Sequence, residues 1–502
     1  MSTILQAIRQ RAERTPDLPA LRSGAQQLSY RDLCAAIDVA SQHLAARRPQ
    51  VLALALENNP AWVVMDLAAL ALGIPVVPVP DFFSATQRAH VLRNASADLL
   101  VCDAPQIYTA LASAKAVEFS VAGGALFFLP LARQSPARLP AHSAKITYTS
   151  GTTGNPKGVC LSAAAQQSVA ASLASACRLA PGDRHLSLLP LSTLLENIGG
   201  VYAPLLAGAC CVLEPLSSVG SVVAGRFDAG AVGSALARVQ ATTTILVPQM
   251  LEALCGALES GEIDLPRLRW VAVGGARVAP RLLQRAEALG LPVYEGYGLS
   301  ECASVVALNT PAAYRAGSVG KPLPHVRLSF GADGEIFVGG ATLLGYVGDD
   351  RPAPQDWPSG DIGHLDADGF LYLHGRKKNV LITSFGRNIS PEWLESELCA
   401  EAAIAQAVVF GDARPWPVAL IVPRRPGLAD IDTYAEIACA VLQVNAGLPE
   451  YARIGDWLLA EPFTVANGQA TSNGRPRRDN IWQQYQQQIA SLYEETPDHV
   501  LP

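Results

Sequence analysis

Charged and aromatic residues are scarce in this chain. Of its 502 residues, 16% are charged and 6% are aromatic, and the formal net charge is -6. This weakly acidic balance argues against the basic surface of a nucleic-acid-binding protein. With 50% hydrophobic residues the chain is not disordered either. Its length allows about three domain-sized units, so the composition predicts a large globular protein and names no partner.

Grouped cysteines are absent. Of the ten cysteines only Cys210 and Cys211 are adjacent, and no C-x-x-C pair or Cys/His cluster has the spacing of a zinc site. Reduced thiols in a cytoplasmic protein are the simplest interpretation. The opening stretch MSTILQAIRQRAERTPD carries charge throughout and lacks the apolar run of a signal peptide. It predicts an amphipathic helix.

A long uninterrupted hydrophobic run is also missing. The most apolar stretch, AWVVMDLAALALGIPVVPVP from Ala61, contains Asp66 and a Gly-Ile-Pro break. It falls short of the roughly 20 apolar residues that span a bilayer. We expect a buried helix followed by a buried strand, and no transmembrane segment. No basic amphipathic anchor is evident, which leaves only peripheral membrane contact open.

Apolar strand-like runs alternate with helical patterns along most of the chain, which predicts an α/β fold with parallel layers. The expected elements are VLALAL at 51–56, a helix from Pro60, PVVPVP at 75–80, TTILVPQ at 243–249, LRWVAVGG at 268–275 and PRLLQRAEALG at 280–290. From about Gly334 the pattern changes to short antiparallel strands, so a small β-rich part should belong to the same large domain.

A domain boundary is predicted at Lys378. Residues 1–377 would form the large N-terminal domain and residues 378–502 a small, mobile α+β domain. In the small domain NVLITS predicts a strand, and Ser390, Pro391 and Glu392 suit the N-cap, N1 and first turn of a helix. IAQAVVFG and PVALIVPR predict paired strands, and IDTYAEIACAVLQVNAG predicts an amphipathic helix.

The most specific motif is ITYTSGTTGNPKGV, from Ile146 to Val159. Glycines let backbone N–H groups turn inward, hydroxyls add donors and Lys157 adds positive charge, which together favour a cradle for a polyphosphate. A Walker A loop is excluded because Pro156 precedes the lysine and Gly158 follows it. The alternative is a polar surface turn. The cradle residues are Thr149, Ser150, Gly151, Thr152, Thr153, Gly154 and Lys157.

This motif resembles the phosphate loop of the adenylate-forming superfamily, which includes acyl-CoA synthetases, aryl-CoA ligases, peptide-synthetase adenylation domains and firefly-type luciferases. The resemblance extends in order from about Leu28 to Arg478. It implies ATP-dependent formation of an acyl-adenylate and transfer of the acyl group to a thiol. ATP, Mg²⁺ and coenzyme A are the implied cofactors, and the acid is a small molecule.

A second motif, YEGYGLSECA, resembles the family's adenine and magnesium segment. The resemblance implies that Tyr297 stacks on adenine, with Gly298 beside it, and that Ser300 contacts the α-phosphate. It assigns magnesium to Glu301 together with Thr152. A carboxylate beside phosphate oxygens needs such a cation between them. Just upstream, VGGARV is similar to the stretch that lines the adenine and acyl sites, with Gly275 and Ala276 admitting close approach.

A third motif, SGDIGHLDADGFLYLHGRKKNVLI, completes the resemblance. It implies that Asp361 accepts hydrogen bonds from the ribose hydroxyls and that Arg376 contacts ribose or phosphate, roles that suit a carboxylate and a guanidinium. Lys378 takes the position of the family's hinge. In SFGRNISPEWLE, Gly386 matches the segment that leaves room for a pantetheine arm.

The acid is expected to be a medium- or long-chain fatty acid. The segment LSLLPLSTLLENIGG lacks the acidic residue with which amino-acid-activating relatives hold an ammonium, and its Pro-Leu-Ser and Glu196 resemble the long-chain acyl-CoA synthetase branch. That branch commonly has histidines where Thr193 and Ala163 stand. Two alternatives stay open: transfer to the phosphopantetheine of an acyl carrier protein, and a degenerate member that binds nucleotide with weak catalysis.

The stretch TSNGRPRR at 471–478 has the composition of a solvated basic tail. The resemblance instead aligns it with a loop whose lysine binds the reacting carboxylate and α-phosphate, with Thr471, Gly474 and Arg478 in register. Arg475 falls on the lysine. We expect Arg475 to act as the catalytic cation, with slower adenylation than a lysine would give, because an arginine-for-lysine change is not conservative.

Overall fold

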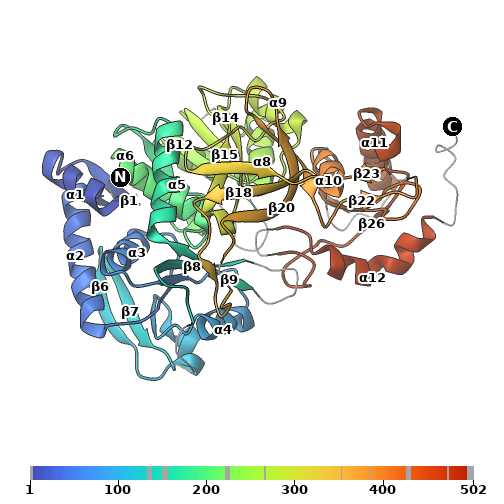
Figure 1. Cartoon of the computed structure of the whole chain (residues 1–502). Helices are drawn as coiled ribbons and strands as arrows, with labels where there is room; N and C mark the ends of the chain where they lie inside the picture. The colour runs from blue at the N-terminus through green and yellow to red at the C-terminus, as the bar shows by residue number, and fades with distance from the viewer. Residues whose placement is uncertain are drawn as a thin grey trace.

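Two mixed sheets form the body of the large N-terminal domain, and a smaller C-terminal domain lies beside it (Figure 1). This computed structural model describes residues 4–132, 138–149, 156–220, 227–264, 267–351, 353–385, 387–425, 431–471 and 474–493. In that part of the chain, no helix is both long and apolar enough to cross a membrane.

The first sheet contains nine strands. In spatial order they are β16 (Lys321–Pro322), β15 (Ser304–Leu308), β14 (Val293–Leu299), β13 (Trp270–Val273), β12 (Thr243–Leu246), β10 (Arg184–Leu186), β11 (Cys210–Val212), β1 (Pro19–Ser23) and β2 (Gln26–Ser29). The run from β14 to β1 is parallel, as predicted, and β15 and β2 pair antiparallel at its two sides.

The second sheet contains eight strands. They are β19 (Gly345–Tyr346), β9 (Lys157–Ser162), β8 (Ser143–Thr149), β4 (Val76–Pro78), β3 (Leu52–Ala55), β5 (Leu99–Cys102), β7 (Gly124–Pro130) and β6 (Val117–Val121). Its centre is parallel, whereas β8 and β9 form an antiparallel pair. These antiparallel pairs at the margins were not predicted from the sequence.

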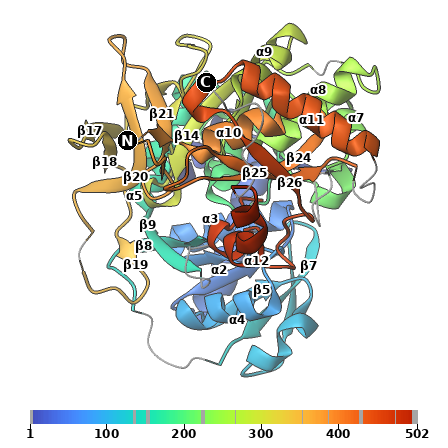
Figure 2. The same ribbon diagram turned by 90° about the vertical axis from the view of Figure 1, so that its right-hand side faces the viewer.

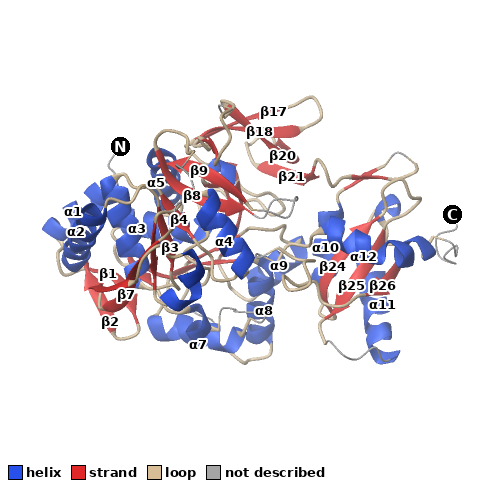
Figure 3. Cartoon of the chain, turned by 90° about the horizontal axis from the view of Figure 1, so that it is seen from below, coloured by secondary structure: helices blue, strands red, loops and turns tan. Residues whose placement is uncertain are grey.

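Helices surround the two sheets (Figure 3). The helices of this domain are α1 (Ile4–Arg14), α2 (Tyr30–Arg47), α3 (Pro60–Leu72), α4 (Ala85–Asn94), α5 (Ala163–Ala176), α6 (Ala203–Ala207), α7 (Ala229–Val239), α8 (Pro248–Glu259) and α9 (Pro280–Ala288). Short 3₁₀ turns are η1 (Pro105–Leu111), η3 (Leu216–Val219) and η4 (Ser300–Cys302), and η2 (Leu195–Tyr202) is π-helical.

The helix α3 shows how local sequence sets element ends. Asn59 caps the helix by accepting a hydrogen bond from the Trp62 N–H, and Pro60 occupies the first turn, where its missing N–H costs nothing. Gly73 ends the helix with a φ of 68°, a left-handed conformation that favours glycine. Most side chains of the helix are buried, which confirms the predicted buried helix and the strand after it.

The β-rich part of the large domain is a four-stranded antiparallel sheet, as expected from the sequence. Its strands are β17 (Val326–Phe330), β18 (Glu335–Gly340), β20 (Asp356–Leu365) and β21 (Leu371–Arg376). The last strand ends two residues before Lys378, so this sheet leads directly into the C-terminal domain.

The C-terminal domain is built on a three-stranded sheet. Its elements are β22 (Leu381–Ile382), β23 (Asn388–Ile389), α10 (Pro391–Cys399), β24 (Ile404–Phe410), β25 (Val418–Pro423), α11 (Ile431–Ala446), η5 (Glu450–Ala452), β26 (Asp456–Leu459) and α12 (Arg478–Ser491). The predicted pairing of β24 with β25 and the predicted helix α11 are confirmed. The helix α10 begins at Pro391 as predicted, although Ser390 makes no capping hydrogen bond.

Side chains alternate between two cores in this domain. Ala407 and Val409 pack with α10 and α11, whereas Val408 and Phe410 pack with α12, as the two-residue period of a strand requires. Figure 2 shows α10 and α11 on one side of the three strands and α12 on the other. The sheet therefore fixes α12, and the loop before it, relative to α10.

Candidate active site

The predicted phosphate loop connects β8 and β9. Thr149 ends β8 and pairs with Lys157, the first residue of β9. Lys157 is exposed, and its Nζ lies 5.9 Å from the centroid of the Tyr346 ring. The strand pair thus holds both ends of the loop in register. The predicted residues between them, Ser150, Gly151, Thr152, Thr153 and Gly154, lie outside the described part of the chain.

Glu301 lies in the turn η4 directly after β14. One of its carboxylate oxygens, Oε1, accepts a hydrogen bond from the Tyr346 hydroxyl at 3.0 Å. Burial, and then the charge of Glu301, raises the pKa of Tyr346 above its ordinary value, so the phenol stays a donor. Tyr346 therefore links Glu301 to Lys157. Sequence reasoning missed Tyr346 because an isolated tyrosine outside the motifs gives no signal.

The Glu301 carboxylate fits a magnesium ligand. Magnesium is commonly held by one or two carboxylates together with substrate phosphates and water. Within the described ranges no group of three or more His, Cys, Asp or Glu side chains is arranged to hold a metal. A single carboxylate near a lysine therefore suits an ion that arrives with a nucleotide, rather than one held in a protein cage.

Tyr297, Asp361 and Arg376 form one cluster, in which Tyr297 and Asp361 are buried and Arg376 is partly exposed. The Tyr297 hydroxyl donates to Oδ2 of Asp361 at 2.6 Å, and Nε of Arg376 lies 2.8 Å from Oδ1 of the same carboxylate. Asp361 and Arg376 are cross-strand partners of β20 and β21, whereas Tyr297 comes from β14. Two motifs far apart in the sequence therefore meet at this carboxylate.

The cluster keeps capacity for a ligand. Burial raises the pKa of Asp361, while the Arg376 charge and the Tyr297 hydrogen bond counteract that rise. An ionised carboxylate accepts about four hydrogen bonds, and these two contacts occupy one position on each oxygen. The carboxylate can still accept from two neighbouring hydroxyls, as a ribose would present them.

Gly298 and Ser300 belong to the same motif, YEGYGLSECA, as Tyr297. A Cβ at Gly298 would stand 1.6 Å from the backbone oxygen of Ser304, so the close approach of the two antiparallel strands requires glycine here. Ser300 begins the turn η4, and its backbone oxygen accepts from the Ala303 N–H. The motif glycine thus has a packing reason that is separate from nucleotide binding.

Glu295 is a buried acid in the same strand. Burial raises its pKa from 4.5 to about 8, against a hydrogen bond from the Val278 backbone and the charge of Arg277. No role was predicted for Glu295 from the sequence. At neutral pH the carboxyl therefore holds its proton in the folded protein.

Arg475 crosses from the C-terminal domain to the large domain. Its Nε donates to the backbone oxygen of Gly275 at 3.0 Å, and its Nη2 contacts the same oxygen. Loss of surrounding water and the charge of Arg376 lower its pKa, whereas Asp361 acts in the opposite direction. Arg475 thus lies within electrostatic reach of the Asp361 cluster. The exposed Ala276 follows directly after Gly275.

The loop before α12 is folded around Thr471. The Thr471 hydroxyl accepts from the Arg475 N–H at 3.0 Å, and the Thr471 N–H donates to the Arg475 backbone oxygen at 2.7 Å. Gly474 turns the chain with a φ of 77°. Arg478 contacts Glu395 of α10 and donates to the Val409 backbone oxygen. The segment is therefore an ordered loop, and the alternative of a solvated tail is excluded for its described residues.

Lys378 follows the end of β21 by two residues. Partial burial and the neighbouring Arg376 lower its pKa, while Asp479 and Glu392 of the C-terminal domain raise it. The adjacent Lys377 instead pairs with Asp333 and Glu335, at 2.7 Å each. Gly386, predicted for the thiol route, lies outside the described residues.

The segment expected near the acyl chain leads into the π-helical turn η2. The Thr193 hydroxyl donates to the Pro190 backbone oxygen at 2.7 Å, and Ala163 is the first residue of α5. Glu196 is fully buried and lies 3.0 Å from Nε2 of His185. This glutamate is therefore engaged inside the protein.

A buried polar network underlies the phosphate loop. Nζ of Lys145 on β8 lies 2.9 Å from Oδ2 of Asp66 on α3, with both side chains 2% exposed. The Tyr202 hydroxyl donates to the same oxygen at 2.7 Å, and Asn197 contacts the Lys145 ammonium. The network ties the strand before the loop to η2. No sequence motif pointed to it.

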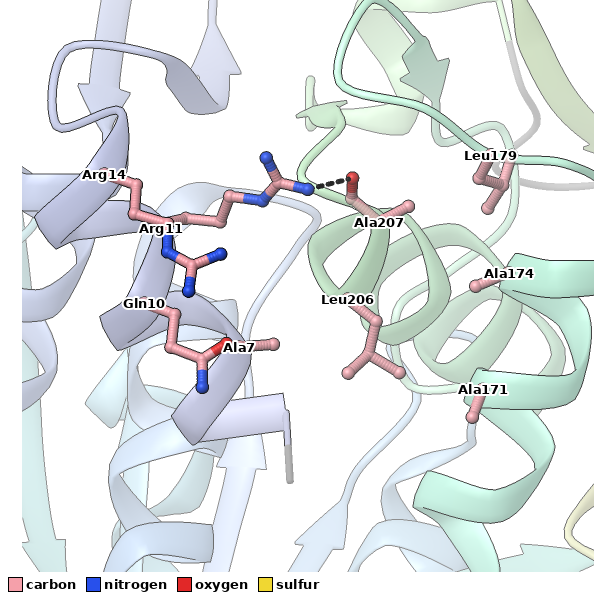
Figure 4. Close-up of a pocket in the computed structure, with 9 residues that line it drawn as sticks. All are labelled: Ala7, Gln10, Arg11, Arg14, Ala171, Ala174, Leu179, Leu206 and Ala207. Atoms are coloured by element: carbon pink, nitrogen blue, oxygen red, sulfur yellow. Dashed lines mark hydrogen bonds between the residues drawn. The ribbon is translucent and has the colours of Figure 1, made fainter. Parts of the chain in front are cut away.

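A cavity of about 470 Å³ lies elsewhere, between α1, α5 and α6 (Figure 4). There Arg11 donates to the Ala207 backbone oxygen at 3.3 Å and packs on Gly208, so it caps the end of α6. None of the residues predicted to bind nucleotide, magnesium or acid lines this cavity, which is therefore separate from the candidate active site.

Both parts of the chain match family models. Residues 8–346 match the model described as AMP-binding enzyme, and residues 378–497 match the AMP-binding enzyme C-terminal domain. The long-chain-fatty-acid–CoA ligase FadD15 of Mycobacterium bovis is 29% identical over 527 residues, with 86% of each chain covered. The indoleacetate–CoA ligase of Aromatoleum aromaticum is 32% identical over 366 residues, covering 67% of this chain and 66% of that protein.

Solved structures share the fold. The anthranilate CoA ligase AuaEII in complex with anthranoyl-AMP has a TM-score of 0.78 at 18% identity, covering 97% of this chain and 98% of the other. The o-succinylbenzoate coenzyme A synthetase (MenE) of Bacillus subtilis, in complex with ATP and magnesium, has a TM-score of 0.72 at 24% identity, covering 94% and 98%. At these identities the likeness establishes the architecture.

Proposed function

Because the chain belongs to the AMP-binding enzyme family, we propose that it activates a carboxylic acid with ATP and transfers the acyl group to the thiol of coenzyme A. The observation that carries this proposal is the contact of Arg475 with Gly275, within electrostatic reach of the cluster of Tyr297, Asp361 and Arg376. Coenzyme A as the acceptor is supported by the names of these relatives, both of which are CoA ligases.

In the first step a carboxylate oxygen attacks the α-phosphorus of ATP, and the bond to pyrophosphate breaks. Asp361 would accept the ribose hydroxyls, and Tyr297 and Arg376 would hold its carboxylate in place. Lys157, Arg376 and Arg475 would neutralise charge on the phosphates and the reacting carboxylate. Glu301 and Thr152 would hold magnesium, which would supply further neutralisation of the phosphate charge.

The thiol step needs a second arrangement of the domains. We place the hinge at Lys378, dividing residues 1–377 from 378–502. The mixed charges around Lys378, with Arg376 on one side and Glu392 and Asp479 on the other, support a residue whose surroundings belong to both domains. The ten free thiols support a cytoplasmic location.

A medium- or long-chain fatty acid is the proposed substrate. Residues 186–200 offer no free acid to an ammonium group, since Glu196 is buried against His185. The FadD15 match over 86% of the chain supports the same class. Because two similar proteins are named as indoleacetate and anthranilate CoA ligases, aromatic acids are also tested.

The test is acid-dependent ATP–pyrophosphate exchange with octanoate, laurate and palmitate against benzoate, indoleacetate and 2-succinylbenzoate. We expect exchange with the fatty acids, followed by thioester formation with coenzyme A. Exchange with aromatic acids alone would correct the substrate, and thioester formation on holo-carrier protein alone would correct the acceptor. No exchange with any acid would overturn the ligase function and leave a nucleotide-binding protein.

The same assay tests Arg475. We expect Arg475→Ala to slow exchange roughly 100-fold, the effect of removing one group that stabilises developing charge. Arg475→Lys keeps the positive charge and should retain most of the activity. If the alanine variant matches the parent, the loop does not supply the catalytic cation.

A further inference from the structure

Two arginines of α9 make ion pairs in opposite directions. Arg285 pairs with Glu259 of α8, inside the large domain, through Nε at 2.6 Å and Nη2 at 2.7 Å. Arg281, one turn earlier on the same helix, contacts Glu397 and Glu401 of the C-terminal domain. The two arginine side chains are about equally exposed, at 34% and 38%. Of these two arginines, Arg281 is therefore the one that connects the domains.

The Arg281 guanidinium uses all three of its nitrogens at the end of α10. Its Nε lies 3.3 Å from Oε2 of Glu397, its Nη2 donates to the Glu397 backbone oxygen at 2.6 Å, and its Nη1 contacts Glu401. The two carboxylates are only 15% and 13% exposed, so water screens them less than it screens a surface pair. The last carbonyls of a helix also favour a cation.

Contacts lead from α10 back to the active site. Glu395 on α10 accepts from the Val409 N–H at 2.7 Å and contacts Arg478 at the start of α12. Arg475 precedes Arg478 by one short turn and reaches Gly275. Gly275 lies between β13 and α9, and Arg281 is the second residue of α9, six residues further along the chain. The contacts therefore run from Arg281 through α10 and the 474–478 loop and return to the large domain at Gly275.

We propose that Arg281 is a positioning residue for adenylation, which holds α10 so that Arg475 is delivered to Gly275. Figure 3 shows α9 and α10 next to each other where the two domains meet. A second pair, Arg424 of the C-terminal domain with Glu252 of α8, lies at the same interface. Arg281 differs from Arg424 because it contacts α10 through Glu397, and α10 also binds Arg478 through Glu395.

The expected consequence is a difference between the two half-reactions. Arg281 acts only in the arrangement in which Arg475 meets Gly275, so its loss should slow formation of the acyl-adenylate and leave thiol transfer from a preformed adenylate unchanged or faster. The dependence of adenylation on salt should also weaken, because an interdomain ion pair is screened by ions. This inference rests on the proposed function, since it concerns the same site.

The test compares Arg281→Ala with the matched control Arg285→Ala. Pyrophosphate exchange measures the first half-reaction with the best acid of the panel, and thioester formation from its isolated adenylate measures the second. We expect Arg281→Ala to slow exchange about fivefold or more, as loss of a partly shielded ion pair predicts, while Arg285→Ala changes neither half-reaction twofold. Arg281→Lys should restore part of the rate.

Hydrogen–deuterium exchange gives a readout that does not depend on catalysis. In Arg281→Ala, the amides of residues 275–281 and 474–478 should exchange faster than in the parent, and in Arg285→Ala they should not. The proposal is overturned if the two variants behave alike, or if Arg281→Ala slows both half-reactions equally. If the parent shows no acid-dependent pyrophosphate exchange, the proposed function fails, and the amide exchange alone decides the positioning role.

Discussion

Replacing Tyr297 by phenylalanine would remove a single hydroxyl from the candidate active site. That hydroxyl donates to Oδ2 of Asp361 at 2.6 Å, and both side chains are buried, at 9% and 6% exposed. The ring would keep its place in the core, while the carboxylate would keep only Arg376 on its other oxygen. The substitution therefore isolates the effect of one hydrogen bond on the predicted ribose acceptor.

The magnitude follows from the charge and the burial. A hydrogen bond to a charged group contributes about 1.5–3 kcal/mol. Its loss removes a contact that stabilises the ionised carboxylate, so the pKa of Asp361 should rise further. Burial already raises this pKa, so the variant moves the carboxyl closer to the assay pH and leaves it less available as an ionised acceptor.

The assay is the pH dependence of kcat/KM for ATP in pyrophosphate exchange. In Tyr297→Phe we expect the KM for ATP to rise about tenfold, as a loss of about 1.4 kcal/mol predicts. The acidic limb of the profile should move to higher pH, because the pKa of Asp361 rises. Tyr372→Phe is the control. Tyr372 lies on β21, next to the strand that carries Asp361, and its substitution should change neither quantity. An unchanged KM together with superimposed profiles would refute the role of the hydroxyl.

Three further predictions concern the interior of the protein. Glu295 has a folded-state pKa of about 8 against its ordinary 4.5, so the folded state keeps a proton that the unfolded state loses, and stability should fall by about 1.4 kcal/mol per pH unit between these values. Glu295→Gln should remove that fall in urea titrations from pH 5 to 8, and an unchanged slope contradicts it. Lys145→Met leaves Asp66 buried and unpaired, which should cost about 3–5 kcal/mol; adding Asp66→Leu should recover most of the loss. A Cβ at Gly200 would lie 2.1 Å from Glu196 Oε1, so Gly200→Ala should destabilise by about 1–3 kcal/mol, measured by urea denaturation.

Residues that begin and end helices made much of the fold predictable. The helix α3 is defined by Asn59, Pro60 and Gly73, all readable from the sequence. Strands β24 and β25 are buried along most of their length, because alternate side chains face two different cores. The antiparallel pairing of β8 with β9 was missed because the apolar runs are the same for either strand direction, and only the short loop between the strands distinguishes them.

The motifs identified candidate residues but not their partners. Asp361 and Arg376 are cross-strand neighbours, a relation that a hairpin pattern can suggest. Tyr346 beside Glu301 and Lys145 beside Asp66 arise from tertiary packing between distant segments. In each pair the two residues are far apart in the sequence and have no characteristic spacing, so no local pattern could have indicated the contact.

The geometry of Arg475 changes how its place in the loop is understood. From the sequence, a planar fork in place of a compact ammonium predicted slower adenylation. In the structure, Nε and Nη2 are both used on the Gly275 oxygen, and the remaining nitrogen, Nη1, still has donors for a carboxylate or phosphate. A lysine carries its three donors on one nitrogen, so it could bind the Gly275 oxygen and a substrate anion together only if both lay within hydrogen-bond distance of that single atom. We therefore infer that arginine suits this loop, because the fork can be held by the backbone and present a charge at the same time.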